Sequence, residues 1–212
     1  LPDMSVLGAG AHGAVSGTVR ATGRAEAGTA TLSLTGRDMA VGQPKLDGLL
    51  RGASQVDLAL ALAEGRIDVR TARVSNPQVQ ASATGSVAAD GSSADLEATL
   101  ALPDLRALGS GFGGAVQAQA RVSGSMKSGA LTLNATTRSL SVGQPQADSL
   151  LRGDGTVQLD LALRDNRIEV RSAALNTPQL QVSASGALTG EAQNLNVDAR
   201  LANLGVVLPE FP

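Results

Sequence analysis

The residues of this chain that could carry catalytic or ligand chemistry are few and isolated. His12 is the only histidine, and its counterpart in a second copy of the same pattern is Gly113. There is no cysteine, so thiolate nucleophiles, thiolate metal ligands and disulfides are excluded. One imidazole and no thiol cannot assemble a catalytic triad or an ordinary zinc site. We therefore predict that the protein is not an enzyme and has no catalytic residue, metal ligand or cofactor.

Two glycine clusters match the dinucleotide-binding spacing G-x-G-x-x-G. They are Gly8, Gly10 and Gly13 in GAGAHG, and Gly109, Gly111 and Gly114 in GSGFGG. That fingerprint has to follow a strand and open a helix, with an acidic residue about 20 positions further on. Each cluster here opens a stretch of alternating residues instead. We interpret both clusters as connections and His12 as an exposed loop residue.

Charged residues follow the pattern of a solvated strand face. Asp68 and Glu169 occupy equivalent positions in RIDVR and RIEVR, where they alternate with arginines. No second carboxylate is recognisably paired with either for acid and base catalysis. The RGD at residues 152–154 has RGA as its counterpart, so we assign its glycine to a helix end and predict no cell-adhesion role.

Composition argues against a nucleic-acid partner. The 17 basic and 19 acidic residues are interspersed, the net charge is −2, and Phe112 and Phe211 are the only aromatic residues. A nucleic-acid surface needs clustered cations for phosphates, and single strands also need aromatic rings for stacking. The sequence lacks both features.

Alternation of apolar and polar residues dominates the chain. Val56, Leu58, Leu60 and Leu62 are separated by single Asp or Ala residues, as a half-buried strand requires. Between such stretches lie turn sequences such as AEGR, RDNR, SNPQ and ADGSS. Because these turns are too short for parallel crossovers, we predict an antiparallel meander.

The pattern occurs twice. Residues 41–87 align without a gap with residues 142–188, at an offset of 101 residues and with about 25 of 47 positions identical. We divide the chain into a first β unit at 1–102, a second at 103–208 and the start of a further unit at 209–212. Each unit is predicted to hold about six strands of roughly eight to ten residues. Very short helices are predicted to begin at Pro44 and Pro145 and to end before Gly52 and Gly153.

The repeated apolar strip has two interpretations. It is either an ordinary core, filled by a second sheet, or an open groove. The scarcity of aromatic side chains and a repeat that can continue indefinitely favour the groove. The competing structure is a structural or adhesive β-solenoid with a dry core and no transport role. Solenoid coils repeat about every 20 residues, whereas this chain shows identity at 101 residues.

Several longer phrases resemble one protein family. They are LPDL…GAV…VSG, VGQP…LLRG before VQLDLAL, the pair RIEVR and QLQVSASG, and the closing ANLGVVLPEFP. Together they resemble the C-terminal β-rich region of the TamB family, the translocation and assembly module proteins of Gram-negative envelopes. The resemblance covers essentially the whole chain and rests on repeat phrasing.

The resemblance implies a fold and a role. TamB is similar to AsmA-like and bridge-like lipid transfer proteins, which implies an all-β, long, curved antiparallel sheet folded into an open trough, or β-taco. It implies a periplasmic location, with an inner-membrane anchor in a part of the parent chain outside this sequence, and contact with TamA through the full-length chain. The implied partners are phospholipid acyl chains, unfolded outer-membrane protein segments and adjacent repeats of the same chain. The implied roles are phospholipid transfer between the membranes and support of outer-membrane protein assembly.

Alternation, independently of the resemblance, selects the residues that would line the groove. The predicted lining residues are Val15, Val19, Leu32, Leu34, Val56, Leu58, Leu60, Leu62, Ile67, Val69, Val79, Leu96, Leu100, Val116, Leu131, Leu133, Val157, Leu159, Leu161, Leu163, Ile168, Val170, Leu180, Val182, Val197 and Leu201.

Overall fold

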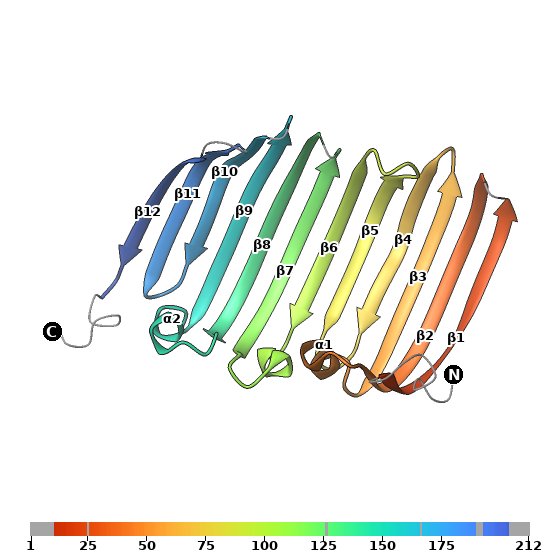
Figure 1. Cartoon of the computed structure of the whole chain (residues 1–212), viewed down its shortest axis with the longest axis horizontal. Helices are drawn as coiled ribbons and strands as arrows, with labels where there is room; N and C mark the ends of the chain where they lie inside the picture. The colour runs from red at the N-terminus through yellow and green to blue at the C-terminus, as the bar shows by residue number, and fades with distance from the viewer. Residues whose placement is uncertain (1–10, 25, 126, 166, 190–192, 204–212) are drawn as a thin grey trace.

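The chain folds into one open sheet. The computed structural model describes residues 11–203 except 25, 126, 166 and 190–192. Twelve strands follow one another in chain order across the sheet, and each strand is antiparallel to the next (Figure 1). Across these described residues, the sheet does not close on itself and the helices are few and short. The prediction of an all-β open antiparallel sheet is confirmed.

Among the described residues, each half of the chain contributes six strands. The first half contains β1 (Ala11–Arg24), β2 (Ala27–Val41), α1 (Pro44–Leu49), β3 (Ala53–Ala63), β4 (Arg66–Ser75), β5 (Gln80–Ala88) and β6 (Ala94–Leu102). The second half contains the 3-10 helix η2 (Leu105–Leu108), β7 (Gly113–Gly124), β8 (Ser128–Ser141), α2 (Pro145–Leu150), β9 (Asp154–Arg164), β10 (Arg167–Asn176), β11 (Leu180–Leu188) and β12 (Gln193–Leu201).

The unit boundary predicted near Pro103 lies between β6 and η2, and β6 pairs directly with β7 across it. The two halves therefore form one continuous sheet. The further unit predicted at 209–212 lies outside the described residues.

The first two strands of each half are longer than predicted. β1 and β2 have 14 and 15 residues, and β7 and β8 have 12 and 14. The pairing shifts register beside Gly13 and Gly114, and Asp38 and Ser139 on the partner strands take positive φ angles of 47°. These bulges let the strands continue where a turn was expected. They also place His12 in strand β1 and not in a loop, although its side chain is exposed as predicted.

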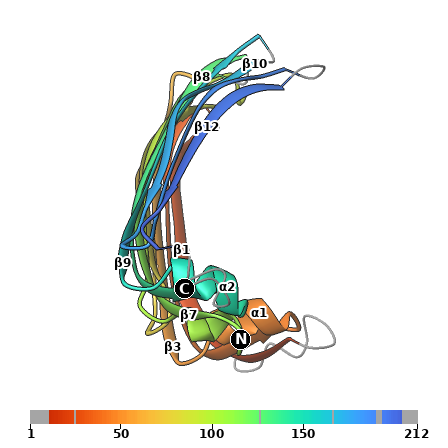
Figure 2. The same ribbon diagram turned by 90° about the vertical axis from the view of Figure 1, so that its left-hand side faces the viewer.

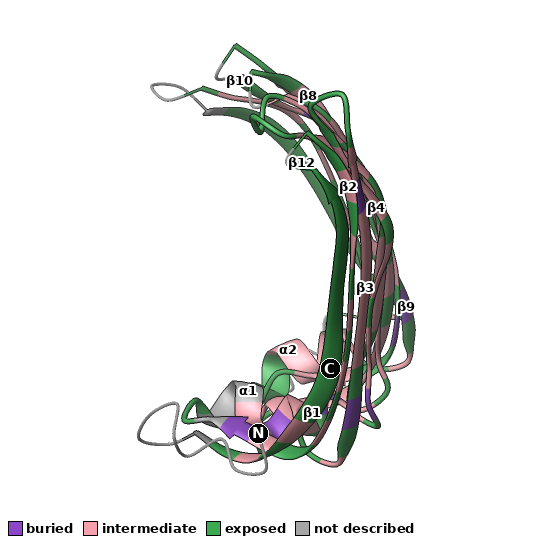
Figure 3. Ribbon diagram, turned by 90° about the vertical axis from the view of Figure 1, so that its right-hand side faces the viewer, coloured by how far each residue is buried: buried purple, intermediate pink, exposed green. Residues whose placement is uncertain are grey.

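The sheet is strongly curved along its strands. Figure 2 shows the strands bending together so that one face of the sheet is concave. The two helices lie at one end of the strands on the concave side, as Figure 3 shows from the opposite direction. The concave face is thus bounded at one end of the strands by α1 and α2, which we call the helical ledge, and at the other end by hairpin turns.

Polar residues attach the ledge to the sheet. Buried Asn76 donates from Nδ2 to the carbonyl oxygen of Leu49 at the end of α1, at 2.6 Å, and to Ser54 Oγ at 3.2 Å. Its Oδ1 accepts the backbone N–H groups of Gln78 and Val79 at 2.8 and 2.7 Å. Asn76 therefore joins the end of α1, strand β3 and the turn before β5.

Thr177 replaces Asn76 in the second half. Its Oγ1 donates to the carbonyl oxygen of Leu150 at the end of α2, at 2.7 Å, and accepts the backbone N–H of Leu180 at 3.0 Å. Asp148 adds a second attachment, because its carboxylate accepts the N–H of Val142 at 2.6 Å. This hydrogen bond holds the pKa of Asp148 below its ordinary value.

We expect Asn76→Ala to free the end of α1. Four hydrogen bonds are lost, and the two orphaned amides and the Leu49 carbonyl cost about 1–3 kcal/mol. Far-UV circular dichroism in urea should show an earlier transition, and hydrogen exchange at the Val79 amide should accelerate. Asn76→Thr, which copies Thr177, should recover much of the loss. Unchanged Val79 exchange in Asn76→Ala would contradict this role.

Candidate functional site: the concave face

Strand register decides which residues share a face. Leu60 pairs with Ala30 on β2 and with Val69 on β4, and Leu161 pairs with Leu131 and Val170. Because paired residues lie on the same face of a sheet and neighbours along a strand alternate, these pairs extend into rows that cross all strands. Three complete rows run across the middle of one face.

These rows contain only Gly, Ala, Val and Leu. The turn-side row is Ala21, Ala30, Leu60, Val69, Gly85, Leu96, Val122, Leu131, Leu161, Val170, Gly186 and Leu195. The middle row is Val19, Leu32, Leu58, Ala72, Ala83, Ala98, Ala120, Leu133, Leu159, Ala173, Ala184 and Val197. The helix-side row is Gly17, Leu34, Val56, Val74, Ala81, Leu100, Ala118, Ala135, Val157, Leu175, Val182 and Ala199.

This apolar face is the concave one. Ser54 pairs with Gly36 beyond the helix-side row and shares its face, and Asn76 connects Ser54 to the end of α1. The helices lie on the concave side of the sheet (Figure 2). With strands about 4.8 Å apart, the twelve strands carry an apolar strip roughly 50 Å long. We call this surface the apolar strip.

The structure brings the predicted lining residues together. All of them except Val79 lie in strands, and the register places these on the concave face, in the three rows or in the incomplete rows beside them. Val79 lies one residue before β5, where its amide bonds to Asn76.

Sequence reasoning missed part of the apolar strip. Val74 and Leu175 belong to it because β4 and β10 each contain one extra residue, Arg70 and Arg171, that the register with β3 and β9 leaves without an opposite residue. Each extra residue reverses the alternation along the rest of its strand. Val122 and Leu195 also belong to it, and simple alternation along their own strands would have found them.

The apolar strip is open in this structure. The exposed large apolar side chains among the described residues are mostly on it, with Val19 at 72% and Val197 at 61% exposure. No large side chain of the described residues is fully buried, and no second sheet is present among them. The second-sheet core considered above is therefore absent from the described chain, and the single antiparallel sheet also differs from a β-solenoid.

Two apolar hollows occur at the turn end of the strip. One, of about 390 Å³, lies against Leu60, Leu62 and Ile67, and the other, of about 320 Å³, lies against Leu161, Leu163 and Ile168. Every residue that lines the first hollow has its counterpart 101 positions later in the lining of the second. The hollow is thus a property of the repeat.

Glycine leaves part of the lining of each hollow without side chains. Gly23 and Gly124 have φ angles of 115° and 95° and pair with Gly28 and Gly129. A Cβ atom at Gly124 would lie 2.4 Å from the carbonyl oxygen of Ser128. A side chain there is both strained and obstructed.

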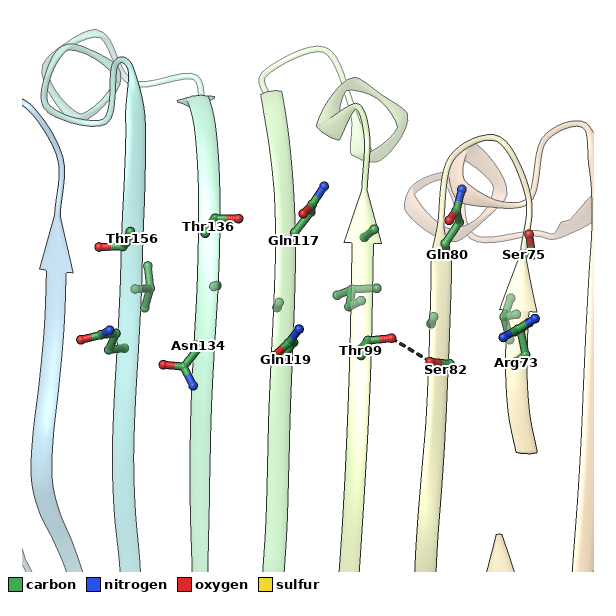
Figure 4. A pocket seen from close by; sticks show the side chains of 18 residues that line it. Arg73, Ser75, Gln80, Ser82, Thr99, Gln117, Gln119, Asn134, Thr136 and Thr156 are labelled. Carbon is green, nitrogen blue, oxygen red and sulfur yellow. Dashed lines mark hydrogen bonds between the residues drawn. The ribbon is translucent and has the colours of Figure 1, made fainter. Parts of the chain in front are cut away.

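The convex face is polar. Figure 4 shows Gln117, Gln119, Asn134, Thr136 and Thr156 side by side around a shallow hollow of about 740 Å³ that spans β4 to β9. Ser82 and Thr99 are joined there by a hydrogen bond of 2.7 Å. The ion pair of Arg121 with Glu97, at 2.9 Å, lies on the same face and is more than half exposed. Such exposed pairs contribute little to stability.

The other sequence candidates do not form a site. Of the described cluster glycines, Gly109 ends η2 and Gly111 lies in the connection to β7, as predicted, whereas Gly13 and Gly114 lie within strands β1 and β7 and not in connections. Gly8 and Gly10 lie outside the described residues. Across the described chain, no group of three or more His, Asp or Glu side chains is arranged to hold a metal. Asp68 lies opposite Ser86 on β5, and Glu169 lies opposite Ala187 on β11, so neither carboxylate faces another one there.

No helix in the described part of the chain is both long and apolar enough to cross a bilayer. Comparisons with protein families, with characterised proteins and with solved structures found no match to this chain. The concave face therefore has to be interpreted from its own chemistry.

Proposed function

We propose that this chain is a segment of a conduit that carries phospholipid acyl chains along its concave face, between the inner and outer membranes of a Gram-negative envelope. The observation that supports this most directly is the open apolar strip, which crosses twelve strands without one polar side chain in its three rows. The resemblance to the TamB family supports a periplasmic location, an outer-membrane partner of the TamA type and a supporting role in outer-membrane protein assembly.

The strength of the expected contact suits transport. Each methylene that is fully removed from water contributes about 0.8 kcal/mol, so a stretch of about ten methylenes half covered by the sheet gains roughly 4 kcal/mol. That corresponds to a dissociation constant of about 1 mM for a single stretch. An acyl chain is thus held without being trapped.

The continuity of the rows suits movement. A chain that slides from Leu133 to Leu159 and on past Ala173 leaves one apolar neighbour and meets another. It meets no charged group whose hydration would have to change on the way, and such changes are expensive. Polar headgroups can remain in water at the open side of the trough (Figure 3).

Native mass spectrometry of the purified chain tests this proposal. Protein expressed in a Gram-negative host and kept in a mild detergent should release phospholipid on collisional activation. A variant with Leu60→Asp and Leu161→Asp, which places one carboxylate in each apolar hollow, should release much less. Thr31→Asp with Gln158→Asp adds the same charge to the convex face and should release as much as wild type. Equal release by all three proteins, or none by wild type, would leave the structural or adhesive role as the better explanation.

A further inference from the structure

Among the described residues, β1 and β12 are the outermost strands of the sheet. β1 and β12 each pair with one neighbour only, and among the described residues no strand covers their outer sides. The exposed edge of β1 belongs to a strand of 14 residues and that of β12 to a strand of nine. Neither strand contains proline or lysine, which often protect sheet edges. In the described part of the chain, both edges are therefore open templates for a further strand.

The chain itself contains an example of the strand pairing that would cover these edges, the joint between its two halves. β6 ends the first half and β7 begins the second, and the two strands pair along nine residue pairs from Ala94–Gly124 to Leu102–Val116. β12 occupies the place of β6 in the second half, and β1 occupies the place of β7 in the first. From this equivalence we propose that β12 of one copy pairs with β1 of a second copy, head to tail.

The rows determine the register of the proposed joint. In the internal joint Leu96 faces Val122 and Ala98 faces Ala120. The same rows place Leu195 opposite Ala21 and Val197 opposite Val19 of the second copy. Among the described residues, Val19 and Val197 are the most exposed large apolar side chains, at 72% and 61%. The joint brings these two side chains together and covers both.

The convex side of the joint is compatible in charge. Inside the chain, Arg121 on β7 contacts Glu97 directly opposite at 2.9 Å and Asp95 diagonally at 3.3 Å. Arg20 is the counterpart of Arg121, and in the proposed register it faces Asn196, with Asp198 at a diagonal position. Diagonal pairs are within reach of long side chains. Arg20 therefore meets one carboxylate and no cation at its nearest positions.

Pairing between like edges does not preserve the trough. Two β1 edges paired antiparallel would put the helical ledges of the two copies at opposite ends of the strands. Two β1 edges paired parallel would turn the concave face of one copy to the other side. Only the head-to-tail joint continues both the ledge and the apolar strip, and because its two surfaces differ it can repeat without closing.

Cysteine cross-linking tests the joint and its register, because the chain has no native cysteine. Copies carrying Val19→Cys are mixed with copies carrying Val197→Cys and oxidised, in a non-ionic detergent that shields the concave faces. We expect at least tenfold more disulfide-linked dimer than from Val19→Cys mixed with Leu195→Cys, which is one row out of register. Each variant alone should remain largely uncross-linked.

An edge substitution supplies a second measurement. Val19→Lys should weaken the concentration-dependent association seen by sedimentation at least tenfold. Val142→Lys, at a valine that is 42% exposed and outside the strands, should leave it unchanged. Three results would overturn the proposal: no association of wild type, preferential linkage between two like edges, or equal linkage by the out-of-register pair. No lipid enters these experiments, so they can fail while the lipid proposal stands.

Discussion

Leu161→Arg is expected to abolish lipid binding to the second half of the apolar strip while leaving the chain folded. Leu161 lies in the turn-side row between Leu131 and Val170 and lines one of the apolar hollows. Without lipid the face is open, so the guanidinium can extend into water and folding loses little. When an acyl chain covers the site, the charge must lose its hydration, at a cost of several kcal/mol.

The expected loss of lipid binding is large because the desolvation penalty is comparable with the whole energy of acyl-chain contact. The desolvation penalty matches or exceeds the roughly 4 kcal/mol that half-covering about ten methylenes provides. Binding of a fluorescent phospholipid should therefore fall at least tenfold in Leu161→Arg, and the equivalent change Leu60→Arg should act in the same way on the first half. Circular dichroism of both variants should match wild type.

Gln158→Arg is the matched control for Leu161→Arg. Gln158 is exposed on the convex face of the same strand, so the same charge is added without entering the apolar strip. Its lipid binding should equal that of wild type. If Leu161→Arg binds lipid normally, or if Gln158→Arg loses binding to the same extent, a continuous apolar path is the wrong description.

An environment-sensitive bimane label at position 159 is expected to report a much less polar surrounding when phospholipid is added, whereas the same label at position 158 is not. Leu159 lies in the middle row between Leu133 and Ala173, and Gln158 faces away from it. Lipid that occupies the strip must contact the first position and cannot reach the second. A blue shift in emission at 159 alone is the expected result.

Leu159→Ala adds an energetic measurement at the same position. In a packed core such a truncation costs about 2–5 kcal/mol because a cavity remains. Leu159 is only half-buried on an open face, so with detergent or lipid present we expect a loss below about 1.5 kcal/mol in urea unfolding. Two indifferent labels together with a full core penalty would show that the strip is covered by protein.

Alternation predicted most of the strip because it depends on the simplest property of a strand, its two-residue period. Leu58, Leu60 and Leu62 could be assigned to one face without knowing their partners. The short helices were predictable for a similar local reason, since Pro44 and Pro145 suit the first helical position.

Features that depend on how the strands pair were harder to predict from the sequence. The extra residues Arg70 and Arg171 leave one trace in the sequence, an odd spacing such as the five positions from Val69 to Val74. The β11–β12 pairing is also displaced by two residues from the repeat, because Leu188 faces Gln193 where the offset of 101 predicts Leu195. The side of the sheet on which α1 lies depends on Asn76 and Ser54, which no periodicity reveals.

Six strands in each half is an even number, and this parity governs how such a molecule can change its length. Duplication of one half lengthens the sheet by about 29 Å, and a single hairpin lengthens it by about 10 Å, at roughly 4.8 Å per strand. In both cases the next strand begins at the same end of the sheet as before. The helices that follow therefore add to the existing helical ledge. Insertion of a single strand would reverse the direction of every later strand and place every later helix at the opposite end of the strands. The length of the sheet can therefore change in steps of whole hairpins without moving any helix to the other end of the strands.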